Sequence, residues 1–227
     1  MAVRLVSYTT PAEEFVKEGI ADNDLLDLVA YCARVSNPAN QMNSETSEKL
    51  VKYLIKHAHW SPLEMVNVCM EIDTTRDIAH QIVRHRSFAF QEFSQRYANP
   101  QEMGDMFVKR EARLQDTKNR QNSIETDDER LQMMWDSKQG EVIRAAQDAY
   151  NWAIENGIAK EQARAVLPEG LTKTRLYMNG TLRSWVHYIE LRGANGTQKE
   201  HMEIAWECAK VIAEIFPLAK DLNAANS

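Results

Sequence analysis

Residues 66–72 read Val-Asn-Val-Cys-Met-Glu-Ile, and residues 76–86 read Arg-Asp-Ile-Ala-His-Gln-Ile-Val-Arg-His-Arg. The first segment alternates apolar and polar side chains, which is the period of a β-strand with one buried face. The second repeats its apolar residues at helical spacing and places on the opposite face the side chains of His80, Gln81, Arg84 and His85. We therefore predict a strand that leads directly into a short amphipathic helix.

Similar patterns recur on both sides of this pair. Residues 3–8 alternate like a strand, and residues 171–182 can be extended; helical spacing predicts helices over 25–32, 50–57, 142–156, 183–191 and 199–216. One of Asp22, Asn23 and Asp24 is expected to cap the first of these helices. Strands are few, and no βαβα order or glycine-rich nucleotide motif occurs. The sequence thus favours an α+β fold, with a small, mostly antiparallel sheet flanked by several helices.

The composition is that of one globular domain spanning residues 1–227. The 27 Lys and Arg residues against 33 Asp and Glu residues give a net charge of −6, which argues against a general nucleic-acid binder or a polybasic membrane protein. No apolar run is long enough for a membrane span, and the first residues do not resemble a signal peptide. Three widely spaced cysteines (Cys32, Cys69 and Cys208) suggest neither a disulfide framework nor a zinc ribbon, so we expect packing roles and a cytoplasmic location.

The segment from about 100 to 140 is polar and has few large apolar residues before Leu131. A structureless loop of that length is unusual in a compact domain. We expect a surface excursion that contains helical pieces and leads into the helix at 142–156.

Residues 76–97 concentrate charge and hydrogen-bonding groups. Arg86 falls in the middle of the apolar helix face, so either the helix has ended there or the guanidinium has a partner. An extended chain beyond the helix places Glu92, Ser94 and Arg96 on one side. Four arginines here suit a phosphate or nucleotide site, although a solvated face with salt bridges explains such charges equally simply.

Arg84-His85-Arg86, followed by seven residues and Ser94, resembles the RHR-x7-S signature of the flavin-dependent thymidylate synthases. Three other segments resemble the family as well: 33–36 (Ala-Arg-Val-Ser), 59–64 (His-Trp-Ser-Pro-Leu-Glu) and 163–168 (Ala-Arg-Ala-Val-Leu-Pro). Arg183 and Arg192 also have the nine-residue separation of the family, so the similarity covers most of the chain. The chain departs from the family pattern at Leu63, at Thr181 and over 193–201.

The resemblance implies the reductive methylation of dUMP to dTMP without a protein nucleophile. The carbon donor would be 5,10-methylenetetrahydrofolate, and the hydride would come from FAD reduced by NADPH. It also implies a homotetramer with sites shared between subunits, and no metal.

By resemblance, Arg192 is the catalytic residue, because it would stabilise negative charge on the pyrimidine. The dUMP site would consist of Gln81, Arg84, Glu92, Phe93, Ser94, Gln95, Arg96, Arg164 and Arg192. The FAD site would consist of Ser36, His59, Ser61, Arg84, His85, Arg86, Glu92, Arg183 and His187.

Three alternatives remain open at this point. A zinc enzyme would use His57, His59, His80 and His85, although their spacing lacks an HExxH pattern. A non-catalytic nucleotide-binding scaffold explains the arginines without chemistry. A family member that binds FAD or dUMP without turnover is the third.

Overall fold

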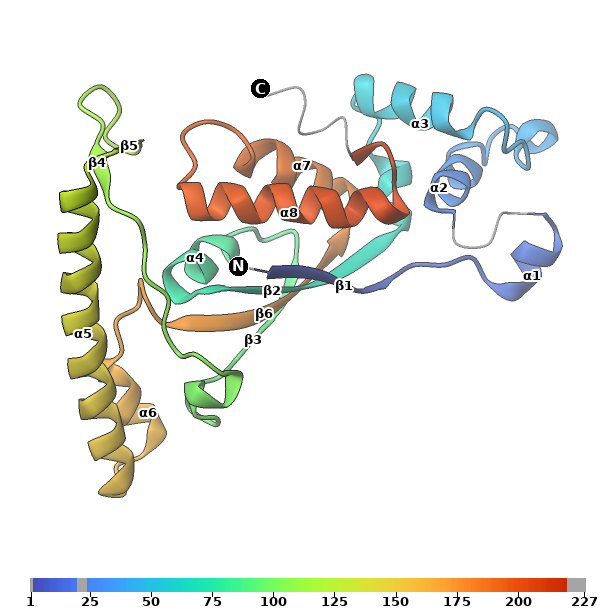
Figure 1. Ribbon diagram of the computed structural model, residues 1–227. Helices are drawn as coiled ribbons and strands as arrows, with labels where there is room; N and C mark the ends of the chain where they lie inside the picture. Colours follow the sequence, from blue (N-terminus) through green and yellow to red (C-terminus); the bar gives the residue numbers. More distant parts are fainter. Residues whose placement is uncertain (1, 20–23, 220–227) are drawn as a thin grey trace.

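A four-stranded sheet forms the centre of the computed structural model, which describes residues 2–19 and 24–219 (Figure 1). The strand order is β1 (Ala2–Tyr8), β2 (Asn67–Thr75), β6 (Lys173–Thr181) and β3 (Ala89–Glu92). Each neighbouring pair of these strands is antiparallel. The expected α+β fold with a small antiparallel sheet is confirmed.

One face of the sheet is covered by α4 (Arg76–Ile82), α7 (Leu182–Arg192) and α8 (Lys199–Ile215) (Figure 1). The alternation in β2 sends Val68, Met70 and Ile72 into this core, where each is fully buried. Burial of one such side chain stabilises the fold by roughly 1.5–3 kcal/mol. Trp185 of α7 adds a hydrogen bond from its ring nitrogen to the Val68 carbonyl oxygen, at 3.0 Å.

The opposite face of the sheet carries charged and polar side chains. Arg4 of β1 donates two hydrogen bonds to Glu71 of β2, at 2.7 and 2.9 Å, and Tyr177 of β6 donates a third at 2.9 Å. The Arg4 hydrogen bond is the main reason that the pKa of Glu71 lies below its usual value. Arg175 pairs in the same way with Asp73.

Short helices extend the core at the end of the sheet away from α5. They are α1 (Glu13–Lys17), α2 (Leu25–Ala33), η1 (Pro38–Asn40), α3 (Ser47–Lys56) and η2 (Ser61–Met65). Asp24 caps α2 by accepting from the Leu26 amide at 2.8 Å, whereas the alternative caps at positions 22 and 23 lie outside the described residues.

The polar excursion contains more regular structure than the sequence indicates. After η3 (Pro100–Met103), β4 (Arg113–Gln115) pairs with β5 (Ser123–Glu125), and α5 (Glu129–Glu155) begins 13 residues before the expected start at Val142. The early turns were missed because this helix stands apart from the core and buries only a narrow stripe (Figure 1). A second small core of Tyr150, Ala153 and Ala163 packs α5 against α6 (Lys160–Ala163), which continues into η4 (Arg164–Val166).

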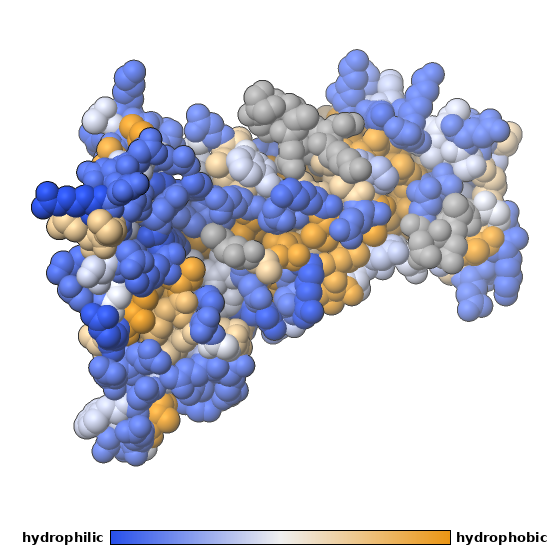
Figure 2. Space-filling model, in the orientation of Figure 1, coloured by the Kyte–Doolittle hydropathy of each residue, from blue (hydrophilic) through white to orange (hydrophobic). Residues whose placement is uncertain are grey.

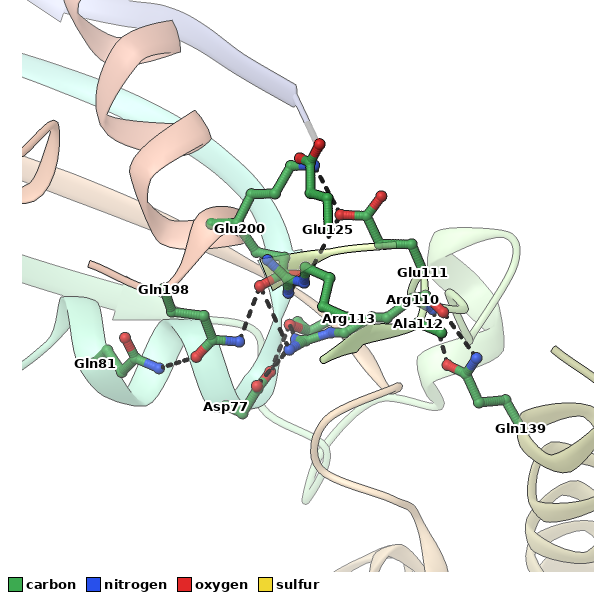
Figure 3. A network of polar contacts seen from close by, with 12 residues as sticks. Asp77, Gln81, Arg110, Glu111, Ala112, Arg113, Glu125, Gln139, Gln198 and Glu200 are labelled. Carbon is green, nitrogen blue, oxygen red and sulfur yellow. Dashed lines mark hydrogen bonds and ion pairs between the residues drawn. The ribbon is translucent and has the colours of Figure 1, made fainter. Parts of the chain in front are cut away.

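Two glutamine side chains of α5 hold the excursion in place. Gln139 accepts from the Arg110 amide and donates to its carbonyl oxygen, both at 2.8 Å (Figure 3). Gln132 makes the same pair with Ala112, at 2.7 and 2.9 Å. We call these two residues the glutamine clamps; each satisfies both backbone polar groups of one residue, as a neighbouring strand would.

The end of α4 settles the two options for Arg86. The helix ends at Ile82, before the guanidinium would enter the apolar face, and Arg86 is exposed. The following loop packs through Phe88 onto Gly180 of β6, where a Cβ atom would lie 2.4 Å from the Phe88 ring. The expectation of extended chain beyond Glu92 was wrong, because the amides of Tyr97 and Ala98 donate to the Ser94 carbonyl oxygen and form a turn.

Candidate functional site

The last turn of α7 brings Arg192 against the RHR segment. The Arg192 Nε–H donates to His85 Nε2 at 2.9 Å, so that ring nitrogen is the acceptor and the His85 proton resides on Nδ1. Burial, together with the Arg192 charge, lowers the pKa of His85 to about 4. His85 is therefore neutral near pH 7 and leaves the two terminal nitrogens of Arg192 available to a ligand.

Gln81, in the last turn of α4, is held by two neighbours. Its amide nitrogen donates to Gln198 Oε1 at 2.8 Å, and its oxygen lies 3.2 Å from His201 Nδ1. His201 and Tyr188 are buried, and the His201 Nε2 lies 3.1 Å from the Tyr188 hydroxyl. These contacts place Gln81 beside the Arg192–His85 pair, because the rings of His85 and Tyr188 are in edge contact with centroids 5.0 Å apart.

The segment after α4 exposes the two other arginines of the signature. The guanidinium groups of Arg84 and Arg86 have no hydrogen bond or ion pair to any described residue, and both residues are exposed. His85 between them points inward. An exposed guanidinium without a carboxylate partner retains all five donors for an anionic ligand.

Glu92 and the turn at 94–97 form the next part of the site. Glu92 accepts hydrogen bonds from Arg76 at 3.2 Å and from the Thr174 hydroxyl at 2.9 Å, which fixes its carboxylate at the end of β3. Phe93 continues the sheet through its amide, which donates to the Arg175 carbonyl oxygen. The hydroxyl of Ser94 has no partner among the residues that the structure describes, and Gln95 is buried with an unpartnered amide nitrogen.

Contacts from α6 bring Arg164 close to this turn. Lys160 donates to the Tyr97 carbonyl oxygen at 3.0 Å, and Glu161 lies 3.5 Å from the Arg96 guanidinium. Arg164 follows directly in η4 and, within the described chain, has no side-chain partner. The structure therefore places α6, which leads directly into Arg164, beside the turn that carries Ser94 and Arg96.

The residues predicted to bind FAD are gathered mainly at the other end of α7. Arg183 forms an ion pair with Glu64 of η2, and His187 packs edge-on against Trp60 with ring centroids 4.4 Å apart. Ser36 and His59 are exposed between helices, and Ser61 is exposed at the first position of η2. Arg192 follows Arg183 by nine positions along the helix, which corresponds to about 14 Å.

Comparisons with known proteins identify the family. The family model for the thymidylate synthase complementing protein, Thy1, matches residues 20–218. The chain belongs to the Thy1 family. It is 48% identical over 224 residues to a probable flavin-dependent thymidylate synthase of Paramecium bursaria Chlorella virus 1, covering 98% of this chain and 99% of the viral one.

Two further similarities extend over almost the whole chain. A flavin-dependent thymidylate synthase of Synechocystis is 46% identical over 220 residues, which is 96% of each chain. The solved structure of a UMP/dUMP methylase, PolB, from Streptomyces cacaoi with 5-Br dUMP has a TM-score of 0.79 at 22% identity, covering 99% of this chain and 95% of that one. The second similarity shows that the two proteins share a fold.

The structure of this Thy1 chain adds residues that the sequence analysis did not single out. They are Tyr188, Gln198, Glu200 and His201. A signal was present for one of them, because His201 stands at helical spacing with Ile204, Ala205 and Cys208 on the apolar face of α8. The contacts of the others depend on three helices meeting, which no local pattern encodes.

The zinc alternative is not supported by the geometry. His57 and His59 lie beside Tyr53, His80 pairs with Glu169, and His85 contacts Arg192. Within residues 2–19 and 24–219, no group of three or more His, Cys, Asp or Glu side chains could hold a metal ion. The same residues include no helix long and apolar enough to cross a membrane.

Proposed function

We propose that this Thy1 family member methylates dUMP to dTMP with FAD as its flavin, NADPH as reductant and 5,10-methylenetetrahydrofolate as carbon donor. One observation carries the proposal: the RHR segment turns His85 inward onto Arg192 while Arg84 and Arg86 remain exposed and unpaired. In this arrangement Arg192 is oriented in advance to stabilise charge, whereas Arg84 and Arg86 are free to bind anionic groups. A site for a nucleotide and a dinucleotide cofactor requires both kinds of group.

The dUMP site is assigned to the turn, to η4 and to the ends of α4 and α7. Arg96 and Arg164 supply charge for the phosphate, and Ser94, Phe93 and Gln95 line the same turn. Gln81, Arg84 and Glu92 border it from α4 and β3, and Arg192 faces the pyrimidine and stabilises negative charge that develops on the ring.

No protein nucleophile is assigned. Burial raises the pKa of the Cys32 and Cys69 thiols above the usual value, and Cys208 is fully buried, so none of them is a reactive thiolate. The Ser94 hydroxyl has no neighbouring base to activate it among the described residues, which suits a ligand to dUMP.

The donors that fit FAD extend from the RHR segment, beside Arg192, to Arg183 at the N-terminal end of α7. Arg84, Arg86 and Arg183 provide guanidinium groups for the diphosphate, and Ser36, Ser61, His59 and His187 provide exposed hydrogen-bonding groups. His85 and Glu92 lie between the two sites. Once bound and reduced by NADPH, FAD would supply the hydride that the reductive methylation of dUMP requires.

A homotetramer with shared sites is part of the proposal. The side of α5 that faces away from the core exposes large apolar side chains, including Met133 at 67% and Trp152 at 60%, and Figure 2 shows such residues among the hydrophilic ones of this helix. Other copies of the chain would cover this surface and complete the FAD site. The single domain and the cytoplasmic location predicted above remain part of the same proposal.

The test is the visible spectrum of the purified protein with FAD, followed anaerobically with NADPH and then with dUMP and the folate. We expect flavin bands that NADPH bleaches faster when dUMP is present, and dTMP formed only with all components. A protein that binds no flavin and makes no dTMP would contradict the proposal. Trapping of a covalent dUMP adduct on Ser94 in the wild type, absent from Ser94→Ala, would contradict its ligand role.

A further inference from the structure

A chain of buried and partly buried hydrogen bonds connects Gln81 to the beginning of α8. The Gln198 amide nitrogen donates to Glu200 Oε2 at 2.9 Å, and Gln81 donates to Gln198 Oε1 at 2.8 Å (Figure 3). His201 Nδ1 then lies 3.2 Å from Gln81 Oε1, and the Tyr188 hydroxyl lies 3.1 Å from His201 Nε2. We call these five residues the amide relay; it joins α4, α7 and α8.

The direction of every bond in the relay follows from its anchor. Glu200 is held as a carboxylate by Arg113, and Arg110 lies 3.8 Å away. Burial alone would raise the pKa of Glu200, but the Arg113 hydrogen bond helps to keep it below its usual value. A carboxylate only accepts, so the Gln198 nitrogen must face it and the Gln198 oxygen must face Gln81.

The same reasoning determines which ring nitrogen of His201 carries the proton. The Gln81 nitrogen faces Gln198, so its oxygen faces His201, and His201 Nδ1 must carry the proton that this oxygen accepts. His201 Nε2 is left as the acceptor for the Tyr188 hydroxyl. His201 is fully buried, so no solvent competes with this arrangement.

We infer that His201 is a positioning residue that presents Gln81 to dUMP, an inference that rests on the function proposed above. One N–H of the Gln81 amide is used by Gln198, and no described residue accepts the other. With the amide locked in this orientation, that second N–H offers the nucleotide a donor for one of its carbonyl or phosphate oxygens. A free amide would present its oxygen as often as its nitrogen and would repel the same ligand atom.

Two conservative variants separate this role from a purely structural one. In His201→Asn the amide nitrogen lies the same number of bonds from Cα as Nδ1, so it can still donate to Gln81. In His201→Gln the amide reaches the Nε2 position beside Tyr188 and leaves Gln81 without its donor. We expect calorimetry to show a dUMP Kd for His201→Gln about 3–10-fold above that of wild type. His201→Asn should remain within about 2-fold of wild type.

The buried residue Cys208 on the same face of α8 supplies the control. Cys208→Ala lowers stability through a cavity but removes no hydrogen bond of the relay, so its dUMP affinity should be unchanged. In the holoenzyme the His201→Gln effect should appear in KM for dUMP and leave kcat within about 2-fold. Equal dUMP affinity of the Asn and Gln variants, at whatever level, would overturn the inference.

A measurement on the unmutated protein keeps the inference testable if a variant does not fold. Nitrogen-15 NMR of protein labelled in its histidine rings should show the His201 proton on Nδ1. A spectrum with the proton on Nε2 would overturn the relay. Failure of wild type itself to bind dUMP would overturn the proposed function. Normal wild-type binding with a wild-type-like His201→Gln would overturn only the role of His201.

Discussion

The two ends of α7 contrast in how their arginines are held. Arg192, at the C-terminal end, donates to a half-buried neutral histidine, and the buried Tyr188 and His201 lie behind it. Arg183, at the N-terminal end, is 43% exposed in its side chain and pairs with a Glu64 side chain that is 40% exposed. The same helix therefore presents one guanidinium that the fold fixes in advance and one that solvent can reach.

This difference matches the roles proposed for the two ends. A group that stabilises charge during the reaction is most effective when it is already oriented and partly shielded from water. A group that binds a cofactor phosphate must exchange its present partner for the ligand, and an exposed ion pair is weak enough to allow that. We therefore expect changes at the Arg192 end to affect turnover, and changes at the Arg183 end to affect cofactor affinity.

The largest effect is expected from Arg192→Ala. Removal of one preorganised donor lowers kcat by about 100–1000-fold in comparable sites. FAD affinity should remain near that of wild type, since Arg192 itself is assigned to the pyrimidine and not to FAD. Anaerobic flavin oxidation and dTMP formation measure the first effect, and a flavin fluorescence titration measures the second; undiminished turnover would break the comparison.

Arg183→Ala should give the opposite pattern. Loss of a charge-assisted bond to a phosphate weakens binding by about 10–100-fold, so the FAD Kd should rise by that amount while the dUMP Kd is unchanged. Lys210→Ala is a matched control, because Lys210 is another exposed cation with one carboxylate partner, Glu207. An equal loss of FAD affinity in both variants would assign the effect to general charge.

The buried end of the helix should also make stability depend on pH. Burial and the Arg192 charge lower the pKa of His201 to about 3 from an ordinary 6.5. Between these values the unfolded chain binds a proton that the folded chain does not, so the free energy of unfolding falls as pH decreases through this window. The loss is at most about 1.4 kcal/mol per pH unit for one such histidine.

Urea denaturation at pH 6.5 and pH 5 measures how the free energy of unfolding changes with pH. His85 contributes to this slope with the same sign, because its pKa is also lowered. In His201→Asn the slope should decrease, since asparagine does not titrate. Carboxylates with lowered pKa values, such as Glu71, act at lower pH and do not interfere. An unchanged slope in His201→Asn would show that this histidine is not the buried neutral group described here.

The smallest effect is expected from Ala58→Gly, beside His59 at the exposed end. Ala58 has φ 55° in the turn that ends α3, where the His59 amide bonds to the Leu54 carbonyl oxygen at 2.8 Å. Glycine adopts this left-handed conformation without the steric cost of a Cβ atom. Denaturation should show a gain of about 0.5–1 kcal/mol, whereas Ala149→Gly on the exposed face of α5 should lose a similar amount.

The sequence was most informative where one face of an element is buried. Val68, Met70 and Ile72 alternate strictly in the sequence because one side of β2 packs on three helices and the other carries ion pairs. Periodicity was least informative for α5, where most of the helix surface is exposed and even the large apolar residues near its start are exposed, namely Leu131, Met133, Met134 and Trp135.

The residues of the candidate site also differ in how far the sequence alone predicts them. Arg84, Ser94 and Arg164 could be named as candidates because the segments that carry them resemble motifs of the family. His201 and Glu200 could not, because their importance comes from contacts across α4, α7 and α8. The turn at Ser94 was mistaken for extended chain because it is made by two local backbone hydrogen bonds rather than by side-chain alternation.

The glutamine clamps have a consequence for how the excursion moves. The amides of Arg110 and Ala112 are protected by single side chains, whereas strand amides are protected by a whole ladder. Each of these amide hydrogens can therefore exchange with solvent after a rotamer change of one glutamine, without unfolding of the sheet or of α5. The clamps therefore let these two backbone amides open independently of each other, from glutamines seven residues apart on one helix face, while the ion pairs of Lys109 and Arg110 still hold the segment.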